Sequence, residues 1–209
     1  MTPRHERERG PGHRHHGNPE DLDAFVARME DPARAEWQRP DEVIRALGLG
    51  ARDVVGEVGP GPGFFTLRLA RVVRHVYSVE AEPRILSVLR DRLAAAGVRN
   101  VTPVLGMDGA PLLAEESIDL ALAVNTFHHF PDGAAYLHAL ASALRPGGRI
   151  ANIDFHKREL PVGPSLEHMV AREDFLSTAE KAGLELVDEK SFLPYQYFLV
   201  LHPKAPRGP

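Results

Sequence analysis

The chain has 209 residues, 43% of them hydrophobic, which suffices for one well-buried domain but not comfortably for two. No apolar run approaches the length of a membrane span, and we expect no signal peptide because the first residues lack an apolar segment. Cysteine is absent, which excludes a disulfide framework, a cysteine-based zinc site and thiol-dependent chemistry. The net charge of −4 argues against a nucleic-acid partner, because neutralising phosphates requires clustered Lys and Arg. These features favour a cytoplasmic protein with a single core.

The two ends of the chain differ in composition from the rest. Residues 1–19 are rich in Arg, His, Gly and Pro and carry almost nothing apolar, which predicts a disordered arm. We expect residues 204–209 to form a short disordered tail. His13, His15 and His16 could bind a metal ion, but histidines in a mobile, Arg-rich arm usually bind nothing specific. We therefore predict no metal site.

Residues 20–50 show helical spacing of apolar residues. One helix is predicted from Leu22 to the break at Asp31-Pro32, and a second from about residue 40 to 48. The single tryptophan, Trp37, lies between them. Its side chain either anchors these helices or helps to roof a ligand site, where exclusion of water would matter.

From residue 51 to 203, strand patterns alternate with helical ones. This alternation predicts an α/β fold in which a doubly wound, largely parallel sheet carries helices on both faces. Strands are expected near 53–58, 75–79, 101–105, 118–124, 148–154, 184–187 and 194–201, and helices near 63–71, 83–96, 133–144 and 172–181.

The most informative segment is the run from Val54 to Phe65, where an apolar strand enters three alternating glycines and a helical pattern follows. Glycines at this point let the chain turn sharply and let a ligand lie against bare main chain. The start of the helix offers N–H groups to a carboxylate or a phosphate. A dinucleotide-binding turn needs Gly-x-Gly-x-x-Gly, and its third glycine would fall on Phe64 or on Thr66, so that pattern fails.

Further motifs follow at the ends of the next strands. The run Val76 to Glu80 ends in an acid, where nucleoside-binding α/β folds hold the ribose hydroxyls. Met107-Asp108 follows the third strand, Asn125 to Asp132 follows the fourth, and Pro146-Gly147-Gly148 precedes the fifth. Together with the glycine run, these motifs resemble those of the class I S-adenosylmethionine (SAM) dependent methyltransferases, in the same order.

The resemblance covers residues 40–155 and is greatest to the type 11 small-molecule methyltransferases, which include ubiquinone and menaquinone C-methyltransferases. It implies a Rossmann-like, seven-stranded sheet, mostly parallel with an antiparallel last strand, within a domain at 51–203. Residues 20–50 would pack over the cofactor site. The implied reaction transfers a methyl group from SAM to an O, N or C atom of a small-molecule acceptor and releases S-adenosylhomocysteine (SAH). The cofactor-binding residues implied are Glu57, Gly59, Gly61, Gly63, Phe64, Glu80, Ala81, Met107, Asp108 and Asn125.

The resemblance also assigns roles within this set. Glu57 orients the glycine turn and the amino group of SAM, and Glu80 chelates the ribose. Ala81, Met107 and Asp108 contact adenine, and Asn125 lies under the methionine part. Pro60 and Pro62 depart from the family pattern. Because proline has no N–H, the carboxylate of SAM would be held through Gly61, Gly63 and Phe64.

Three histidines are candidates for a general base, because imidazole titrates near neutrality. His128 and His129 follow the fourth strand, and His156 follows the fifth, at the carboxyl end where open α/β sheets bind ligands. For the adjacent pair a structural role is the alternative, since the resembling family carries paired histidines here across different substrates. Asn125-Thr126-Phe127-His128 lacks the Asn/Asp-Pro-Pro-Tyr/Phe pattern of nucleic-acid amino-methyltransferases, which argues against that chemistry.

Two other functions stay open at this point. One is a SAM-binding module without catalysis. The other is a nicotinamide-dependent oxidoreductase, against which Phe64 in place of a glycine argues. The acceptor, the atom that is methylated, the need for a base and the oligomeric state, monomer or homodimer, have no readable pattern in the sequence.

Overall fold

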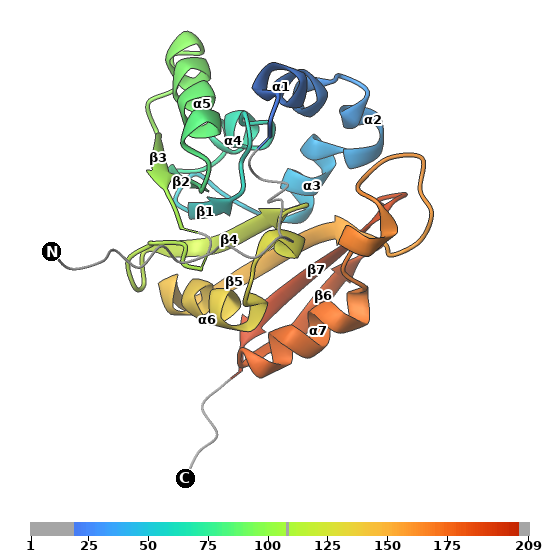
Figure 1. The fold of residues 1–209 in the computed structure, drawn as a ribbon. Helices are drawn as coiled ribbons and strands as arrows, with labels where there is room; N and C mark the ends of the chain where they lie inside the picture. Colours follow the sequence, from blue (N-terminus) through green and yellow to red (C-terminus); the bar gives the residue numbers. More distant parts are fainter. Residues whose placement is uncertain (1–18, 108, 205–209) are drawn as a thin grey trace, which may run out of the picture.

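Seven strands form the sheet of this computed structural model, which describes residues 19–107 and 109–204 (Figure 1). The strands are β1 (Val54–Val58), β2 (His75–Glu80), β3 (Val101–Leu105), β4 (Ile118–Val124), β5 (Leu144–Phe155), β6 (Leu184–Lys190) and β7 (Gln196–Pro203). Their order in the sheet is β3-β2-β1-β4-β5-β7-β6. Strand β7 runs antiparallel to β5 and β6, and the other neighbours are parallel. The predicted doubly wound sheet with an antiparallel last strand is confirmed.

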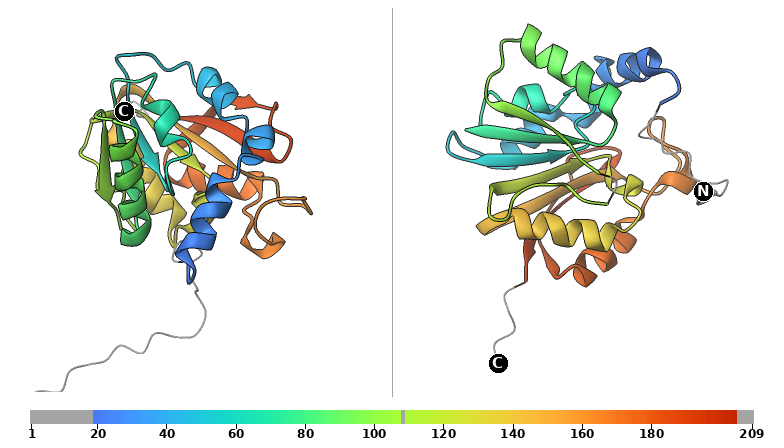
Figure 2. Two further views of the ribbon diagram at one scale, coloured as in Figure 1. Left: turned by 90° about the horizontal axis from the view of Figure 1, so that it is seen from above. Right: turned by 60° about the vertical axis from the view of Figure 1, so that its left-hand side comes forward.

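Helices cover both faces of the sheet, as predicted (Figure 2). They are α1 (Leu22–Glu30), α2 (Arg34–Gln38), α3 (Pro40–Ala46), α4 (Thr66–Leu69), α5 (Pro83–Ala95), α6 (Gly133–Ala143) and α7 (Arg172–Lys181), with 3-10 turns at Phe127–His129 and Leu166–His168. Helices α1 to α5 lie on one face, and α6 and α7 lie on the other (Figure 1). One hydrophobic cluster packs beneath α6 and α7 around Phe175 and Leu137, and a second packs beneath α3 and α4 around Val43 and Leu69.

Capping residues start the helices that follow β2 and β4 along the chain. Glu82 follows β2 and accepts the N–H of Arg84 at 3.0 Å, and Pro83 occupies the first position of α5. Asp132 accepts the N–H of Ala135 at 3.0 Å at the start of α6. These sharp helix starts leave the carboxyl ends of β2 and β4 in short loops. The strand order reverses between β1 and β4, because β1 to β3 extend toward one edge of the sheet and β4 to β7 toward the other. Open α/β sheets bind ligands in a crevice at such a reversal, so we expect a ligand crevice there.

Three elements differ from the expected boundaries. Helix α2 was not predicted, because a five-residue helix has too little periodicity to show. Helix α4 spans four residues rather than 63–71, since turns follow the glycines. Strand β5 starts at Leu144 rather than near 148, because the chain passes through Pro146-Gly147-Gly148 as a bulge opposite Ile118–Leu120.

Several expectations concern residues outside the described part of the chain. These are the arm up to residue 18 with its histidines, Asp108, and residues 205–209 of the tail. Within the described residues, no helix is both long and apolar enough to cross a bilayer. Nor does any group of three potential ligands among the described His, Asp and Glu side chains gather as a metal site would require.

Candidate active site

The glycine turn joins β1 to α4 and carries the backbone angles that its sequence predicts. Gly59, Gly61 and Gly63 have φ values of 66°, 56° and 99°, which disfavour residues with a Cβ. A Cβ at Gly59 would lie 2.4 Å from the Oγ1 of Thr126, so close packing against the loop after β4 also requires glycine. At Gly61, by contrast, nothing lies within 4 Å of the Cβ position. The main chain at Gly61 therefore faces open space in which a ligand could lie.

Most N–H groups of the turn already have partners within the protein. Gly59 donates to the carbonyl of Val79 at 3.0 Å, and Gly63 donates to that of Pro60 at 3.1 Å. The N–H of Gly61 points to a carboxylate oxygen of Glu80 at 3.3 Å. From the sequence, we expected the N–H groups of Gly61 and Gly63 to hold the carboxylate of SAM. In the structure, both of these N–H groups donate to other groups of the protein.

Glu57 lies within β1 and is 3% exposed. Its Oε2 accepts hydrogen bonds from the hydroxyls of Thr66 in α4, at 2.6 Å, and Ser78 in β2, at 3.2 Å. Burial raises the pKa of Glu57 to about 7, although both hydroxyls favour the ionised form and oppose this effect. Glu57 therefore ties the start of α4 to two strands, and this explains how it can orient the turn.

Glu80 ends β2 beside the glycine turn and is 7% exposed. One oxygen faces the N–H of Gly61, and the other accepts the N–H of Glu82 at 3.1 Å. Burial raises the pKa of Glu80, while these backbone hydrogen bonds act in the opposite direction. The carboxylate therefore lies next to the open space over Gly61. This arrangement suits a ligand whose hydroxyl groups contact Glu80 while another part of the same ligand extends across the glycine turn.

The predicted adenine-binding residues lie at the neighbouring strand ends. Ala81 is exposed directly after Glu80. Met107 is 62% exposed and forms an isolated antiparallel bridge with Ala110, just beyond β3. A largely exposed methionine side chain at this edge is available to a flat apolar ligand. Asp108 is not among the described residues.

Asn125 follows β4 in a left-handed conformation, with φ of 54°. Its backbone N–H donates to Ile153 of β5 at 2.8 Å, and its Oδ1 accepts from the Nε2 of Gln196 at 2.6 Å. Gln196 starts β7 and is 1% exposed. Sequence reasoning missed Gln196, because a glutamine at the start of a strand carries no recognisable pattern.

His128 and Asp154 form a buried pair across the ends of β4 and β5. The Nδ1 of His128 lies 3.2 Å from the Oδ2 of Asp154, and the two side chains are 8% and 1% exposed. The other carboxylate oxygen accepts the N–H of Phe155 at 2.8 Å. Because a carboxylate only accepts, Nδ1 carries a proton, so Nε2 is the ring nitrogen that can accept one. The ring of His129 lies 4.1 Å from that of His128, centroid to centroid.

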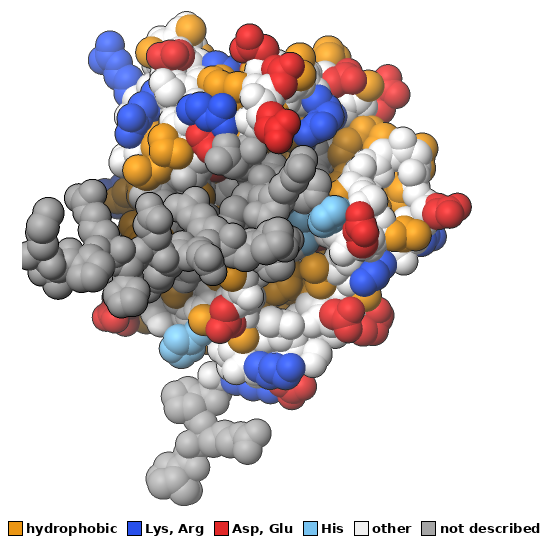
Figure 3. Space-filling view, viewed as in Figure 1, with side chains coloured by type: hydrophobic (Ala, Val, Ile, Leu, Met, Phe, Trp, Pro, Cys, Tyr) orange, Lys and Arg blue, Asp and Glu red, His pale blue; other side chains and the backbone are white. Residues whose placement is uncertain are grey.

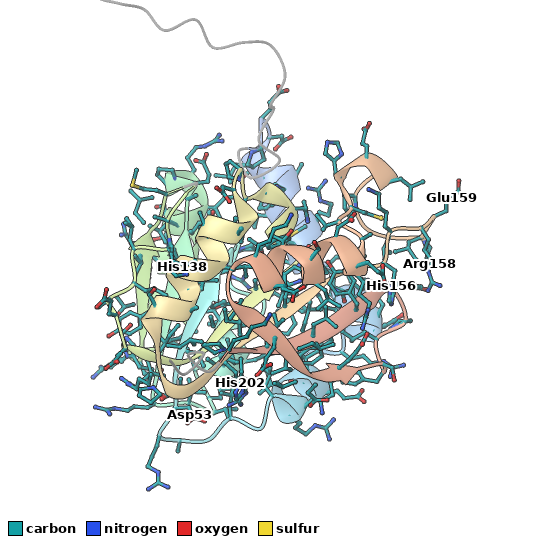
Figure 4. The ribbon with its side chains drawn as sticks, turned by 90° about the horizontal axis from the view of Figure 1, so that it is seen from below. Asp53, His138, His156, Arg158, Glu159 and His202 are labelled. Atoms are coloured by element: carbon teal, nitrogen blue, oxygen red, sulfur yellow. The ribbon has the colours of Figure 1, made fainter. Side chains whose placement is uncertain are left out.

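His156 directly follows β5, two residues beyond Asp154. Its ring centroid is 6.0 Å from that of Tyr197, and its backbone N–H donates to Tyr195 at 3.0 Å. Burial lowers the pKa of His156, followed by the charge of Arg158, while Glu189 acts in the opposite direction. Figure 4 shows His156 beside α7, with Arg158 near it at the outer end of the sheet. The structure thus brings His128 and His129 together and surrounds His156 with the charged side chains of this outer end.

Residues 56–152, just under half of the chain, match the type 11 family that is described as a methyltransferase domain. This match confirms the resemblance that the motifs predicted.

Individual relatives agree with this assignment. Methyltransferase GfsG of Streptomyces halstedii is 29% identical over 76% of this chain and 62% of its own length. Demethylmenaquinone methyltransferase of Tropheryma whipplei is 28% identical over 74% of this chain and 64% of its own length. The chain thus spans a little under two thirds of the length of these two relatives. A SAM-dependent methyltransferase from Aquifex aeolicus has the same fold, with a TM-score of 0.81 and 22% identity over 87% of this chain and 97% of that one.

Proposed function

We propose that this protein transfers a methyl group from SAM to a small-molecule acceptor and releases SAH. The observation that carries the proposal is the buried carboxylate of Glu80 beside the open main chain at Gly61. When bound, SAM would supply a methyl group on a sulfonium; attack of an acceptor oxygen, nitrogen or carbon on the methyl carbon would break its bond to sulfur and release SAH. The protein must therefore orient the two molecules, exclude water and, for a poorly ionised acceptor, remove a proton.

The residues of the site fit these tasks. Glu80 would accept hydrogen bonds from the ribose hydroxyls, and Met107 would pack on the adenine. Glu57 holds the glycine turn in place through Thr66 and Ser78. Asn125, fixed by Gln196, would lie under the methionine part of SAM. Each of these groups comes from the carboxyl end of β1 to β4 or the loop that follows, so one ligand could touch them all.

His128 is the best placed of the three histidines to accept a proton from an acceptor. Asp154 holds its Nδ1–H, which leaves Nε2 as a basic nitrogen and would stabilise the imidazolium that forms. Asp154 is in this sense a positioning residue. His156 lacks such a partner among the described residues and lies by the charged outer end of the sheet, so we give it no part in the proton transfer.

Two observations support a small molecule as the acceptor. One of the relatives is named for a quinone precursor, demethylmenaquinone. In addition, Lys and Arg side chains are interspersed with Asp and Glu over the described surface visible in Figure 3, and the net charge of −4 disfavours a nucleic acid. The cytoplasm is the proposed compartment, because such an enzyme works where its methyl donor is supplied. The methyltransferase family of residues 56–152 argues against a nicotinamide-dependent oxidoreductase.

A labelling experiment tests this proposal. The protein is incubated with methyl-labelled SAM and, separately, with the small-molecule, RNA and protein fractions of a bacterial extract. We expect label in the small-molecule fraction, with release of SAH, and much less label from a Glu80→Ala variant at a low concentration of SAM. Label in RNA or protein instead would overturn the choice of acceptor. Binding of SAM without transfer to any fraction would favour a non-catalytic SAM-binding module.

A further inference from the structure

Helix α2 lies against the glycine turn through the side chain of Arg34. The guanidinium carbon of Arg34 is 4.5 Å from the centre of the Phe64 ring, directly after the last glycine of the turn. The Nη2 of Arg34 donates to the Oε1 of Gln38 at 2.8 Å, and its Nη1 donates to the backbone oxygen of Met29. Arg34 and Gln38 therefore form a unit beside the turn that sequence motifs do not mark.

The amide of Gln38 has a donor without a partner. The side chain is fully buried, and its Nε2 has no hydrogen bond within the described structure. Oε1 already accepts from Arg34, which can only donate. Turning the amide so that its oxygen and nitrogen exchange places would set two donors against each other and would not satisfy the unpaired N–H. A buried, unpaired donor is costly, so its presence in a native fold points to a partner from outside the chain, either a ligand or a water molecule.

Arg34 also lacks a partner of opposite charge. Among the described residues, no carboxylate forms an ion pair with its guanidinium. Burial, followed by the charges of Arg28 and Arg68, lowers the pKa of Arg34 to about 10, while the more distant carboxylate of Asp31 acts in the opposite direction. Arg68 provides a comparison on the same ring. Its guanidinium is also 4.5 Å from Phe64, but it pairs with Asp41 at 3.5 Å. Arg34 is half-buried, and charges that are partly withdrawn from water favour a partner of opposite charge, so Arg34 is suited to a bound anion.

The glycine turn itself has few donors to offer an anion. The N–H groups of Gly61 and Gly63 are engaged, and Pro60 and Pro62 have none. Of the three donors expected from the sequence, only the N–H of Phe64 has no partner among the described residues. We propose that Arg34 and Gln38 of α2 bind the carboxylate at the amino-acid end of SAM, in place of the missing donors of the turn. This assignment rests on the proposed function, since it requires that SAM binds here. A guanidinium with an adjacent amide N–H suits a carboxylate, because both groups donate and one is charged.

Binding measurements with two probes test this proposal without an acceptor. Calorimetry compares SAM with decarboxylated SAM, which keeps the sulfonium, the adenosine and the amine but lacks the carboxylate. The wild type should prefer SAM. Gln38→Glu keeps an acceptor for Arg34, removes the donor and adds a negative charge, and Arg34→Met removes a positive charge. Each should weaken SAM binding by about ten- to a hundredfold, and neither should weaken the binding of decarboxylated SAM.

Arg68→Met is the matched control, because it removes an equivalent stacking guanidinium from Phe64 and should preserve the preference for SAM. If Arg34→Met and Gln38→Glu weaken both probes equally, the two residues only support the turn and the proposal is wrong. It is also wrong if the wild type binds both probes with equal affinity. If Arg34→Met does not fold, Gln38→Glu decides alone. Failure of the wild type to bind SAM at all would instead contradict the proposed function.

Discussion

The carboxyl group of Glu57 should make the stability of this protein depend on pH in a way that one substitution removes. Glu57 is fully buried among β1, β2 and α4, and burial raises its pKa from 4.5 to about 7. Below pH 4.5 the group is protonated in both the folded and the unfolded chain. Between pH 4.5 and 7 the unfolded chain loses this proton and the folded chain keeps it, so the contribution of Glu57 to stability is lost as the pH rises through 7.

The size of this effect follows from the two pKa values. A rise from 4.5 to about 7 corresponds to about 3 kcal/mol of unfolding free energy, an order-of-magnitude figure for so buried a group. Glu57→Gln removes the titration, and its amide oxygen can still accept from Thr66 and Ser78. The free energy of unfolding of the variant minus that of the wild type should therefore increase by about 3 kcal/mol between pH 4.5 and 8.

Urea unfolding of both proteins across this pH range measures the difference. The other titrating groups, including Glu80, are present in both proteins and largely cancel. A difference that stays constant with pH, or that decreases as the pH rises, would refute the reasoning about Glu57. Saturating SAH should not be present, because a ligand that binds only the folded state adds its own stabilisation.

The other residues of the site lead to further predictions. Glu80→Ala should weaken SAM binding by about ten- to a hundredfold in calorimetry while the protein still folds, and normal affinity would show that Glu80 does not hold the ribose. Once an acceptor is found, His128→Ala should reduce turnover by about 10²- to 10⁴-fold, whereas His156→Ala should change it little, and the reverse result would move the base to the end of β5. His128→Ala should also lower the unfolding free energy by about 1–3 kcal/mol, because it leaves Asp154 buried without its partner, and a thermal melt as stable as the wild type would contradict the buried pair.

Sequence patterns predicted the fold well because it rests on long, regular signals. Strands β1 and β4 are nearly continuous apolar runs, and the glycines that follow β1 need positive φ values that few other residues adopt. Glu80 could be placed in the same way, since the end of the second strand in a doubly wound sheet lies beside the end of the first.

The rest of the site depends on contacts between distant parts of the chain. The pair of His128 and Asp154 spans 26 residues, and that of Asn125 and Gln196 spans 71. Nothing in the local pattern of either residue marks its partner. Helix α2 escaped prediction for a related reason, since its stability comes from Trp37 against Phe155 and from Arg34 on Phe64 rather than from helical periodicity.

The central claim is that the glycine turn and Glu80 form a site for SAM and SAH. Thermal melting with SAH or with NAD tests it most directly. At about 100 times its dissociation constant, SAH should add roughly 2.7 kcal/mol of stability, and for a domain of this size the Tm should rise by about 5–10 °C. NAD at the same concentration should leave the Tm unchanged. A Tm that does not move with SAH, or that rises equally with NAD, would contradict the account.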